Sequence, residues 1–245
     1  MFYEKVTVPQ RRMEVRKDGN WYYFLHIPKT GGTTLRFLLY EHIPQYKIYP
    51  NHFDFYIKQR DKYVKAKSFM DRPDKYLTPN KTWIMGHFGI ELFDKLPGQP
   101  ITLAFFREPT RRVKSAISFR MLKNHIYDGL TKEEVLSTKI EFLGSEQAQF
   151  LGYDPSINNL DNAIQTLRKL NFVGITEQYD RSIKLLNKMF DLNLKLGSRK
   201  NSGSYDNVEF NESDDLIIAQ HCAIDEQIYI AAKVRFEELC IEYTV

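Results

Sequence analysis

Short apolar runs alternate along this chain with stretches that have helical spacing. Four runs rich in aromatic and β-branched residues predict buried strands, at 21–27, 82–85, 101–106 and 172–175. Between and after them, apolar residues recur every three or four positions and predict helices. The helical positions are Leu35, Leu38 and Leu39; Val113, Ala116, Ile117 and Met121; Leu160, Ala163, Ile164, Leu167 and Leu170; Tyr179, Ile183, Leu186 and Phe190; and Ile217, Ile224, Ile228, Ala231 and Phe236.

The order of these elements indicates the fold class. Strands that alternate with helices are joined by crossovers and form a parallel sheet. We therefore expect an α/β protein, with a central parallel sheet flanked by helices. No internal repeat or long linker interrupts the chain, so we expect residues 1–245 to form a single domain. Residues 1–20 are expected to be an N-terminal arm or an edge strand, and 213–239 one long helix with a possible break.

The first strand leads into a loop that is suited to phosphate. Its residues are Lys29, Thr30, Gly31, Gly32, Thr33 and Thr34. A strand, a glycine- and hydroxyl-rich loop and then a helix present backbone N–H groups and the positive end of a helix to an anion. The lysine precedes the glycines, so this is not the Walker A order G-x-x-x-x-G-K-[ST]. The alternative is a glycine turn between a core strand and a helix, without a ligand.

A second loop of similar design follows the strand at 101–106. Arg107 ends the strand, Pro109 suits the first turn of a helix, and Ser115 lies two turns into that helix. Arg107 and Ser115 are placed to converge on one anion. The alternative for this stretch is a basic amphipathic helix on the surface.

A histidine follows the strand at 82–85. His87 comes directly after Gly86, at a strand end where the ligand sites of open α/β sheets gather. A lone histidine is more often structural than catalytic, so both readings remain open. No group of acidic residues, histidines or cysteines has the spacing of a metal site.

Residues 43–82 differ in composition from the rest of the chain. They contain eight aromatic residues, and nine Lys or Arg against four Asp, which leaves an excess of five positive charges. Aromatic and basic side chains suit sugars that carry acidic groups. The segment is therefore either an acceptor-binding surface or a solvated loop and helix with its aromatics packed beneath it.

Composition adds bounds on environment. Of the 245 residues 42% are hydrophobic, and the net charge of +4 is too small to indicate nucleic acid as a partner. No apolar run approaches the ~20 residues of a membrane span, and residues 1–16 lack the apolar core of a signal peptide. Cys222 and Cys240, placed on one expected helix, cannot bridge. These features predict a soluble, cytoplasmic protein with free thiols.

The loop sequence HIPKTGGTTL resembles the 5′-phosphosulfate loop of sulfotransferases that use 3′-phosphoadenosine 5′-phosphosulfate (PAPS). It is most similar to the carbohydrate branch that includes heparan sulfate 2-O-sulfotransferase. REPTRRVKSAISF resembles the 3′-phosphate element of that family, R-[DE]-P-x-x-R-x-x-S, and GHFGIELF resembles its histidine element. Residues 172–190 resemble its late strand and helix, whereas 145–153 do so only loosely. Animal members of the branch are membrane-anchored Golgi proteins, so this chain is expected to be a soluble relative or a trimmed piece.

The resemblance implies the P-loop-NTPase-like sulfotransferase fold and a reaction. A sulfuryl group would pass from PAPS to an acceptor hydroxyl, on a saccharide or polysaccharide, leaving adenosine 3′,5′-bisphosphate and needing no metal. His87 would be the base and Lys29 would stabilise the leaving phosphate. The implied binding residues are Lys29, Thr30, Gly31, Gly32, Thr33 and Thr34 for the 5′-phosphate, Arg107, Arg112 and Ser115 for the 3′-phosphate, and Arg199 and Lys200 in a closing loop.

Two other classes of function stay open at this stage. A phosphoryl-transfer enzyme on a related sheet would need a Walker A order and an acidic Mg²⁺ ligand after a strand, and neither is evident. A nucleotide-binding module without chemistry would need no base, whereas His87 follows a strand end.

Overall fold

The five strands of the described chain form one sheet in which every pairing is parallel. A computed structural model describes residues 22–49, 69, 71, 82–96, 100–123, 125–196 and 208–245. The strand order is β2-β3-β1-β4-β5. The strands are β1 (Tyr22–Leu25), β2 (Ile48–Tyr49), β3 (Trp83–Gly86), β4 (Ile101–Phe106) and β5 (Phe172–Ile175). The expected α/β class with a central parallel sheet is confirmed.

Strands β1, β3 and β5 are buried on both faces, which explains their continuous apolar sequences. All four residues of β1, β3 and β5 are buried. Tyr22 pairs with Trp83 on one side and with Ile101 on the other, and the rings of Tyr22 and Trp83 stack with centroids 4.3 Å apart. The predicted strands at 101–106 and 172–175 coincide with β4 and β5. The sequence missed β2, which has only two residues.

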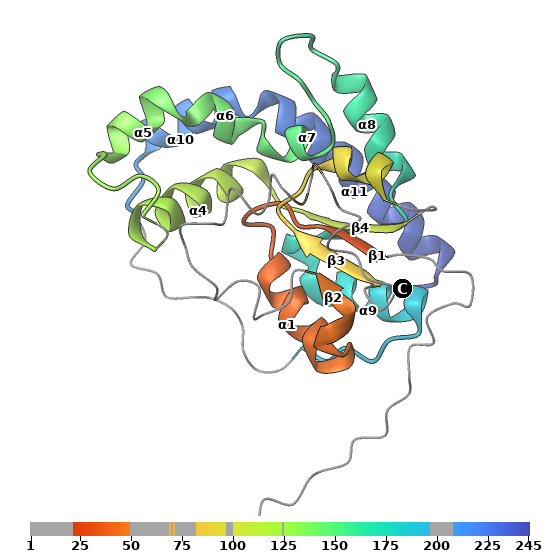
Figure 1. Ribbon diagram of the computed structural model, residues 1–245. Helices are drawn as coiled ribbons and strands as arrows, with labels where there is room; N and C mark the ends of the chain where they lie inside the picture. Colours follow the sequence, from red (N-terminus) through yellow and green to blue (C-terminus); the bar gives the residue numbers. More distant parts are fainter. Residues whose placement is uncertain are drawn as a thin grey trace, which may run out of the picture.

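Helices cover both faces of this sheet (Figure 1). In that view α1 and α9 lie below the strands, while α7, α8 and α11 lie above them. The helices are α1 (Gly32–His42), α4 (Pro109–Leu122), α5 (Lys132–Thr138), α6 (Ile140–Gly144), α7 (Glu146–Phe150), α8 (Leu160–Lys169), α9 (Tyr179–Phe190), α10 (Glu212–His221) and α11 (Ala223–Glu242). Short 3₁₀ turns are η1 (Gln45–Lys47), η4 (Ile90–Lys95) and η5 (Thr176–Gln178).

The helical pattern after residue 212 forms two helices, so the break that the sequence left possible in this long helix is present. The backbone at Cys222 has φ −89° and ψ 3°, which interrupts the helix between α10 and α11. Ile218 and Cys222 join a small apolar cluster with α4, α5 and α6, whereas Ile228 and Phe236 of α11 join the main core on the sheet. The break lets each half reach a different apolar surface. Cys222 and Cys240 are both buried and unbridged, as expected.

Several expectations fall outside the described residues. They are the N-terminal arm at 1–20, Trp21, most of the segment at 43–82, and Arg199 with Lys200. No described helix is both long and apolar enough to cross a lipid bilayer.

A glycine in β5 tests how tightly this sheet is packed. A Cβ added to Gly174 would lie 2.6 Å from Cε1 of Phe105, a fully buried residue of β4. We expect Gly174→Ala to lower the free energy of unfolding by ~1–3 kcal/mol, because the ring must move inside a filled core. Urea denaturation measures this change.

Gly89→Ala is the matched control for this substitution. Its added Cβ would meet the end of the flexible, exposed Glu91 side chain, which can move aside. We expect the control to change stability by less than ~0.5 kcal/mol. Equal stability of the two variants would contradict the packing at Gly174.

Candidate active site

Three loops meet at the C-terminal edge of the sheet. β3 ends beside His87, β1 runs into residues 26–31 and β4 runs into Arg107, and parallel pairing places these ends together. Nδ1 of His87 lies 2.7 Å from the carbonyl oxygen of His26. The guanidinium of Arg107 donates from Nη1 to the carbonyl of Lys29 at 3.1 Å. Because β1 and β3 are parallel neighbours, His87 and Lys29 lie at the same edge of the sheet.

The loop between β1 and α1 has the backbone of an anion-binding turn. Lys29 and Gly31 adopt left-handed conformations, with φ 68° and φ 85°. The hydroxyl of Thr30 is buried and donates to the carbonyl of Ile27 at 3.0 Å, so it braces the turn from inside. Helix α1 begins at Gly32 and has no acidic residue in its first turn. The positive end of this helix is therefore open to an anion.

Among the residues that the structure describes, only some of the backbone N–H groups that were expected to hold phosphate lack a hydrogen-bond partner in the first turn of α1. The N–H of Thr34 donates to the carbonyl of Gly31 at 3.1 Å, and that of Leu35 approaches the same oxygen at 3.4 Å. Gly32 and Thr33 precede these bonds, where a helix offers its own N–H groups no acceptor. Thr33 is also exposed. The amides of Gly32 and Thr33 are thus the best placed for a ligand.

Contacts from residues that are distant in sequence, Thr176 and Tyr179, hold this loop in place. Oγ1 of Thr176 lies 2.7 Å from the carbonyl oxygen of Thr30, and the hydroxyl of Tyr179 donates to the carbonyl of Gly31 at 3.0 Å. A Cβ on Gly31 would lie 2.8 Å from the Tyr179 ring, and one on Gly32 would overlap the ring of His26. Both glycines are therefore required by close approach, and Gly31 by its positive φ as well.

Lys29 lies among other cations. Its Nζ is 4.1 Å from the centre of the Phe119 ring on α4. Partial burial, together with the positive charges of Arg107 and Arg120, lowers the pKa of Lys29 to about 8. Ser115 precedes Phe119 by one helical turn and is half-buried, so it lies on the face of α4 that carries the Phe119 ring. A bound anion would relieve the repulsion among these charges.

The rings of the two histidines at this edge are in contact and tilted relative to each other. The ring centroids of His26 and His87 are 4.4 Å apart, and Phe24 stacks on the other side of His26 at 5.2 Å. Because a carbonyl can only accept, Nδ1 of His87 must carry the proton, which leaves Nε2 able to accept one. His26 is buried, whereas His87 is exposed to solvent.

Desolvation keeps both imidazoles neutral. It lowers the pKa of His26 well below its usual value and lowers that of His87 less. The hydrogen bond to the His26 carbonyl and the charge of Glu146 oppose the shift at His87. Since His87 keeps contact with water, we expect only a modest shift there. A neutral imidazole with a free Nε2 at the sheet edge can act as a proton acceptor.

A buried glutamine fixes the backbone of Arg107. The Nε2 of Gln147 donates to the carbonyl of Arg107 at 3.0 Å, and the N–H of Arg107 donates to Oε1 of Gln147 at 3.0 Å. Gln147 is fully buried at the start of α7. Glu108 follows Arg107 and caps α4 by accepting from the N–H groups of Thr110 and Arg111. The Arg107 side chain is therefore attached to a backbone that is held in one conformation.

Arg112 does not reach the ligand side of this site, which corrects its expected role. It has no exposed surface, and its Nη1 donates to Glu146 at 2.6 Å. Its Nε lies 3.7 Å from Asp225, and Nη2 donates to the carbonyl of Leu143. Position 112 precedes the apolar Ala116 by one turn, on the inner face of α4. Arg112 is a structural cation that holds α4 to its neighbours.

Seven residues that contact the predicted ones were not found from the sequence. Glu146 and Gln147 lie in the segment at 145–153, which resembles the sulfotransferase branch only loosely. Their partners are more than thirty positions away, so local spacing carries no signal of them. The residues missed are His26, Arg120, Glu146, Gln147, Thr176, Tyr179 and Asp225.

The described part of the segment at 43–82 is partly core. The ring of Phe69 is fully buried, with its centroid 4.4 Å from that of Tyr49 and 4.8 Å from that of Phe88. Tyr46 is 60% exposed. Of the expected acceptor-binding aromatics, at least Phe69 therefore serves packing. The basic residues of this segment, such as Lys58, lie outside the described residues.

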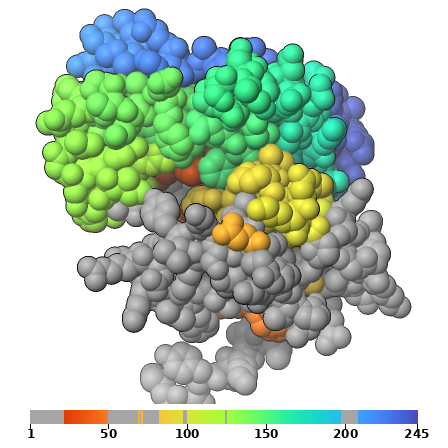
Figure 2. Space-filling view, turned by 45° about the horizontal axis from the view of Figure 1, so that its top comes forward, coloured from red at the N-terminus to blue at the C-terminus, as the bar shows by residue number. Residues whose placement is uncertain are grey.

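Figure 2 shows red atoms of the first described strand and loop beneath the green helices that follow β4.

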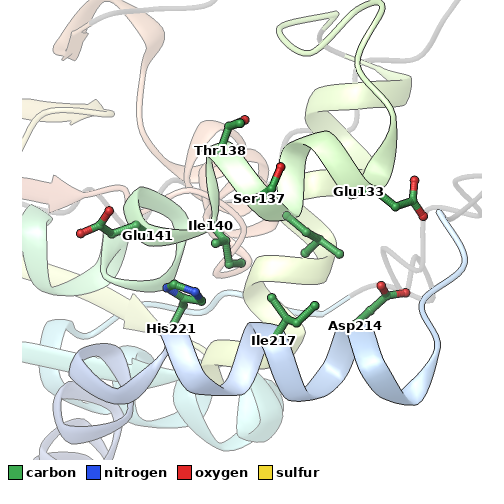
Figure 3. A pocket seen from close by; sticks show the side chains of 9 residues that line it. Glu133, Ser137, Thr138, Ile140, Glu141, Asp214, Ile217 and His221 are labelled. Atoms are coloured by element: carbon green, nitrogen blue, oxygen red, sulfur yellow. The ribbon is translucent and has the colours of Figure 1, made fainter.

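A separate hollow of about 380 Å³ lies between α5, α6 and α10 (Figure 3). Its lining includes the carboxylates of Glu133, Glu141 and Asp214 together with His221. Carboxylates repel phosphate and sulfate, so this hollow does not suit an anionic donor.

Comparison with models of protein families finds no match, and comparison with curated proteins finds none either. Within the described residues, no three side chains from His, Cys, Asp and Glu are grouped to hold a metal ion. The function is therefore inferred from the residues at the sheet edge.

The structural role of Arg112 can be tested by stability. We expect Arg112→Ala to lower the free energy of unfolding by ~3–5 kcal/mol, because Asp225 would be left as a buried carboxylate without a cation and Glu146 would keep only Arg120. Urea denaturation measures the loss. Arg111→Ala, an exposed neighbour on the same helix, should change it by less than ~0.5 kcal/mol. If Arg112→Ala were as stable as the wild type, the structural role would be wrong and Arg112 would again be a candidate for binding the ligand.

Proposed function

We propose that this protein is a PAPS-dependent sulfotransferase with the P-loop-NTPase-like sulfotransferase fold, acting on a hydroxyl of a saccharide or polysaccharide. One observation carries the proposal. Two strand–loop–helix elements suited to anions, one with Lys29 and one with Arg107, are hydrogen bonded to each other, and the imidazole of His87 lies at the same edge. The resemblance of both elements to the sulfotransferase motifs supports it.

The residues fit the donor. The loop at Gly31 and Gly32, the first turn of α1 and the charge of Lys29 suit a 5′-phosphosulfate, and Arg107 with Ser115 suits a 3′-phosphate. The donor would supply an activated sulfur–oxygen bond. Gly31 and Gly32 give no room for a side chain where the loop packs on Tyr179 and His26.

In this reaction His87 would act on the acceptor hydroxyl and Lys29 on the leaving phosphate. His87 accepts the acceptor hydroxyl proton at Nε2 while the acceptor oxygen forms its bond to sulfur. Lys29 faces the bond that breaks, where the electron pair moves onto the 5′-phosphate oxygen, and stabilises that growing charge. The products are a sulfate ester and adenosine 3′,5′-bisphosphate. Lys29 and Arg107 neutralise the phosphates without requiring a divalent ion.

The first test is nucleotide selectivity in calorimetry without acceptor. We expect adenosine 3′,5′-bisphosphate to bind at least about tenfold more tightly than AMP, since a charge-assisted contact contributes ~1.5–3 kcal/mol. Arg107→Ala should remove most of this preference. Arg168→Ala on α8 is the control and should retain it. Equal affinity of the wild type for the two nucleotides would contradict the proposal, and tighter binding of ATP with Mg²⁺ would favour a phosphoryl-transfer enzyme.

The second test concerns His87 and uses single-turnover transfer from labelled PAPS, with acceptors screened from acidic oligosaccharides onward. His87→Ala should bind the bisphosphate normally and transfer ~10²–10⁴-fold more slowly, the usual contribution of a positioned base. A variant that transfers at the wild-type rate would make the histidine structural. The base would then be sought at Glu91 and Asp94.

The pH profile of kcat/KM gives a third test. His87 must be neutral, and its pKa is lowered, so activity should persist to a pH below the ordinary imidazole value of ~6.5 before it falls. Lys29 must be charged, and its pKa is about 8, so activity should decline above that pH. His87→Ala should lose the acid limb and retain the alkaline one. An acid limb above the ordinary imidazole value would contradict the assignment.

A further inference from the structure

Arg120 is a cation held at this site by the protein itself. It lies on α4, one position after the Phe119 ring that contacts Lys29. Its Nη2 donates to Oε1 of Glu146 at 2.5 Å, and the other oxygen of that carboxylate is bound by Arg112. The guanidinium carbon is 5.9 Å from the centre of the Tyr127 ring and 5.8 Å from that of Phe142. These contacts fix the guanidinium and leave little freedom to its side chain, which is 13% exposed.

One donor of this guanidinium lacks an acceptor. Within the described chain, Nη1 of Arg120 is buried and makes no hydrogen bond. An unsatisfied buried donor is costly, and an anionic ligand would remove that cost. The positive charge of Arg120 also acts on both Lys29 and His87, since it lowers the pKa of each. Arg120 is therefore within electrostatic reach of both ends of the proposed reaction.

We propose that Arg120 binds the sulfuryl group of the donor, at the point between Lys29 and His87. This inference rests on the proposed function and adds a residue to it. The loop at Gly32 accounts for the 5′-phosphate and Arg107 for the 3′-phosphate. The remaining anionic group of the donor is the sulfuryl, and in an in-line displacement it lies between the leaving oxygen and the base. Glu146 orients the guanidinium while Nη1 donates to a sulfuryl oxygen.

Binding of two nucleotides that differ by this one group tests the assignment without any acceptor. PAPS carries the sulfuryl group and adenosine 3′,5′-bisphosphate lacks it. In calorimetry on the full chain we expect Arg120→Met to weaken PAPS by at least about tenfold, the effect of one charge-assisted contact, and to change the bisphosphate by less than about twofold. The quantity compared is the ratio of the two dissociation constants. Partial unfolding of a variant lowers both affinities equally and leaves this ratio unchanged.

Two further variants complete the experiment. Arg120→Lys keeps a charge beside Glu146 but cannot bridge the carboxylate and a ligand with one planar group, so its ratio should shift in the same direction. Lys123→Met removes an exposed charge just after α4 and should keep the wild-type ratio. If the wild type binds both nucleotides and no Arg120 variant alters the ratio, the assignment is wrong and the proposed function stands. If the wild type binds neither, both are wrong.

Discussion

A guanidinium without access to solvent depends on partners inside the protein, and Arg112 finds them at the point where three helices meet. Glu146 of α7 and Asp225 of α11 supply the carboxylates. Asp225 also accepts the N–H groups of Gln147 and Ala148, at 3.1 Å and 2.9 Å, so the same carboxylate caps α7. A buried ion cluster of this kind adds little net stability but is costly to break. It therefore specifies one arrangement of α4, α7 and α11.

That arrangement determines the geometry of the candidate site. With α7 fixed, Gln147 holds the backbone of Arg107 by both its N–H and its carbonyl. With α4 fixed, Arg120 reaches the same Glu146 that neutralises Arg112. Arg107 and Arg120 are thus positioned by the buried residues Gln147 and Glu146. Desolvation raises the pKa of Asp225 to about 6, which shows how far the ion cluster is removed from water.

The sheet edge combines groups that repel one another in the free protein. Lys29, Arg107 and Arg120 are brought together before any anion is bound, and their mutual repulsion contributes to the low pKa of Lys29. The free energy of folding offsets this repulsion. An anion that binds is therefore stabilised by charges that need no rearrangement. The two histidines behave in the opposite way. Desolvation lowers the pKa of each imidazole, and nearby positive charge, from Lys29 at His26 and from Arg120 at His87, lowers it further, so His87 can accept a proton while Lys29 remains charged.

The sequence predicted those parts of the structure that depend on local pattern. β4 and β5 were placed to the residue because both faces of each strand are buried, which gives an uninterrupted apolar run. β2 was missed because a two-residue strand has no period to detect. Parallel order also placed the ends of β1 and β3 at one edge, since this follows from topology alone. Long-range contacts such as Gln147 with Arg107 leave no trace in spacing.

Arg112 shows how a motif and a periodicity can disagree over the same residue. The motif counts positions from Arg107 and assigns Arg112 to the ligand. The helical period instead places it one turn before Ala116, which belongs to the buried face with Val113 and Ile117. The structure agrees with the period. A charged residue on the apolar face of a helix needs a buried partner of opposite charge, so the position of Arg112 itself predicts a distant acid such as Glu146.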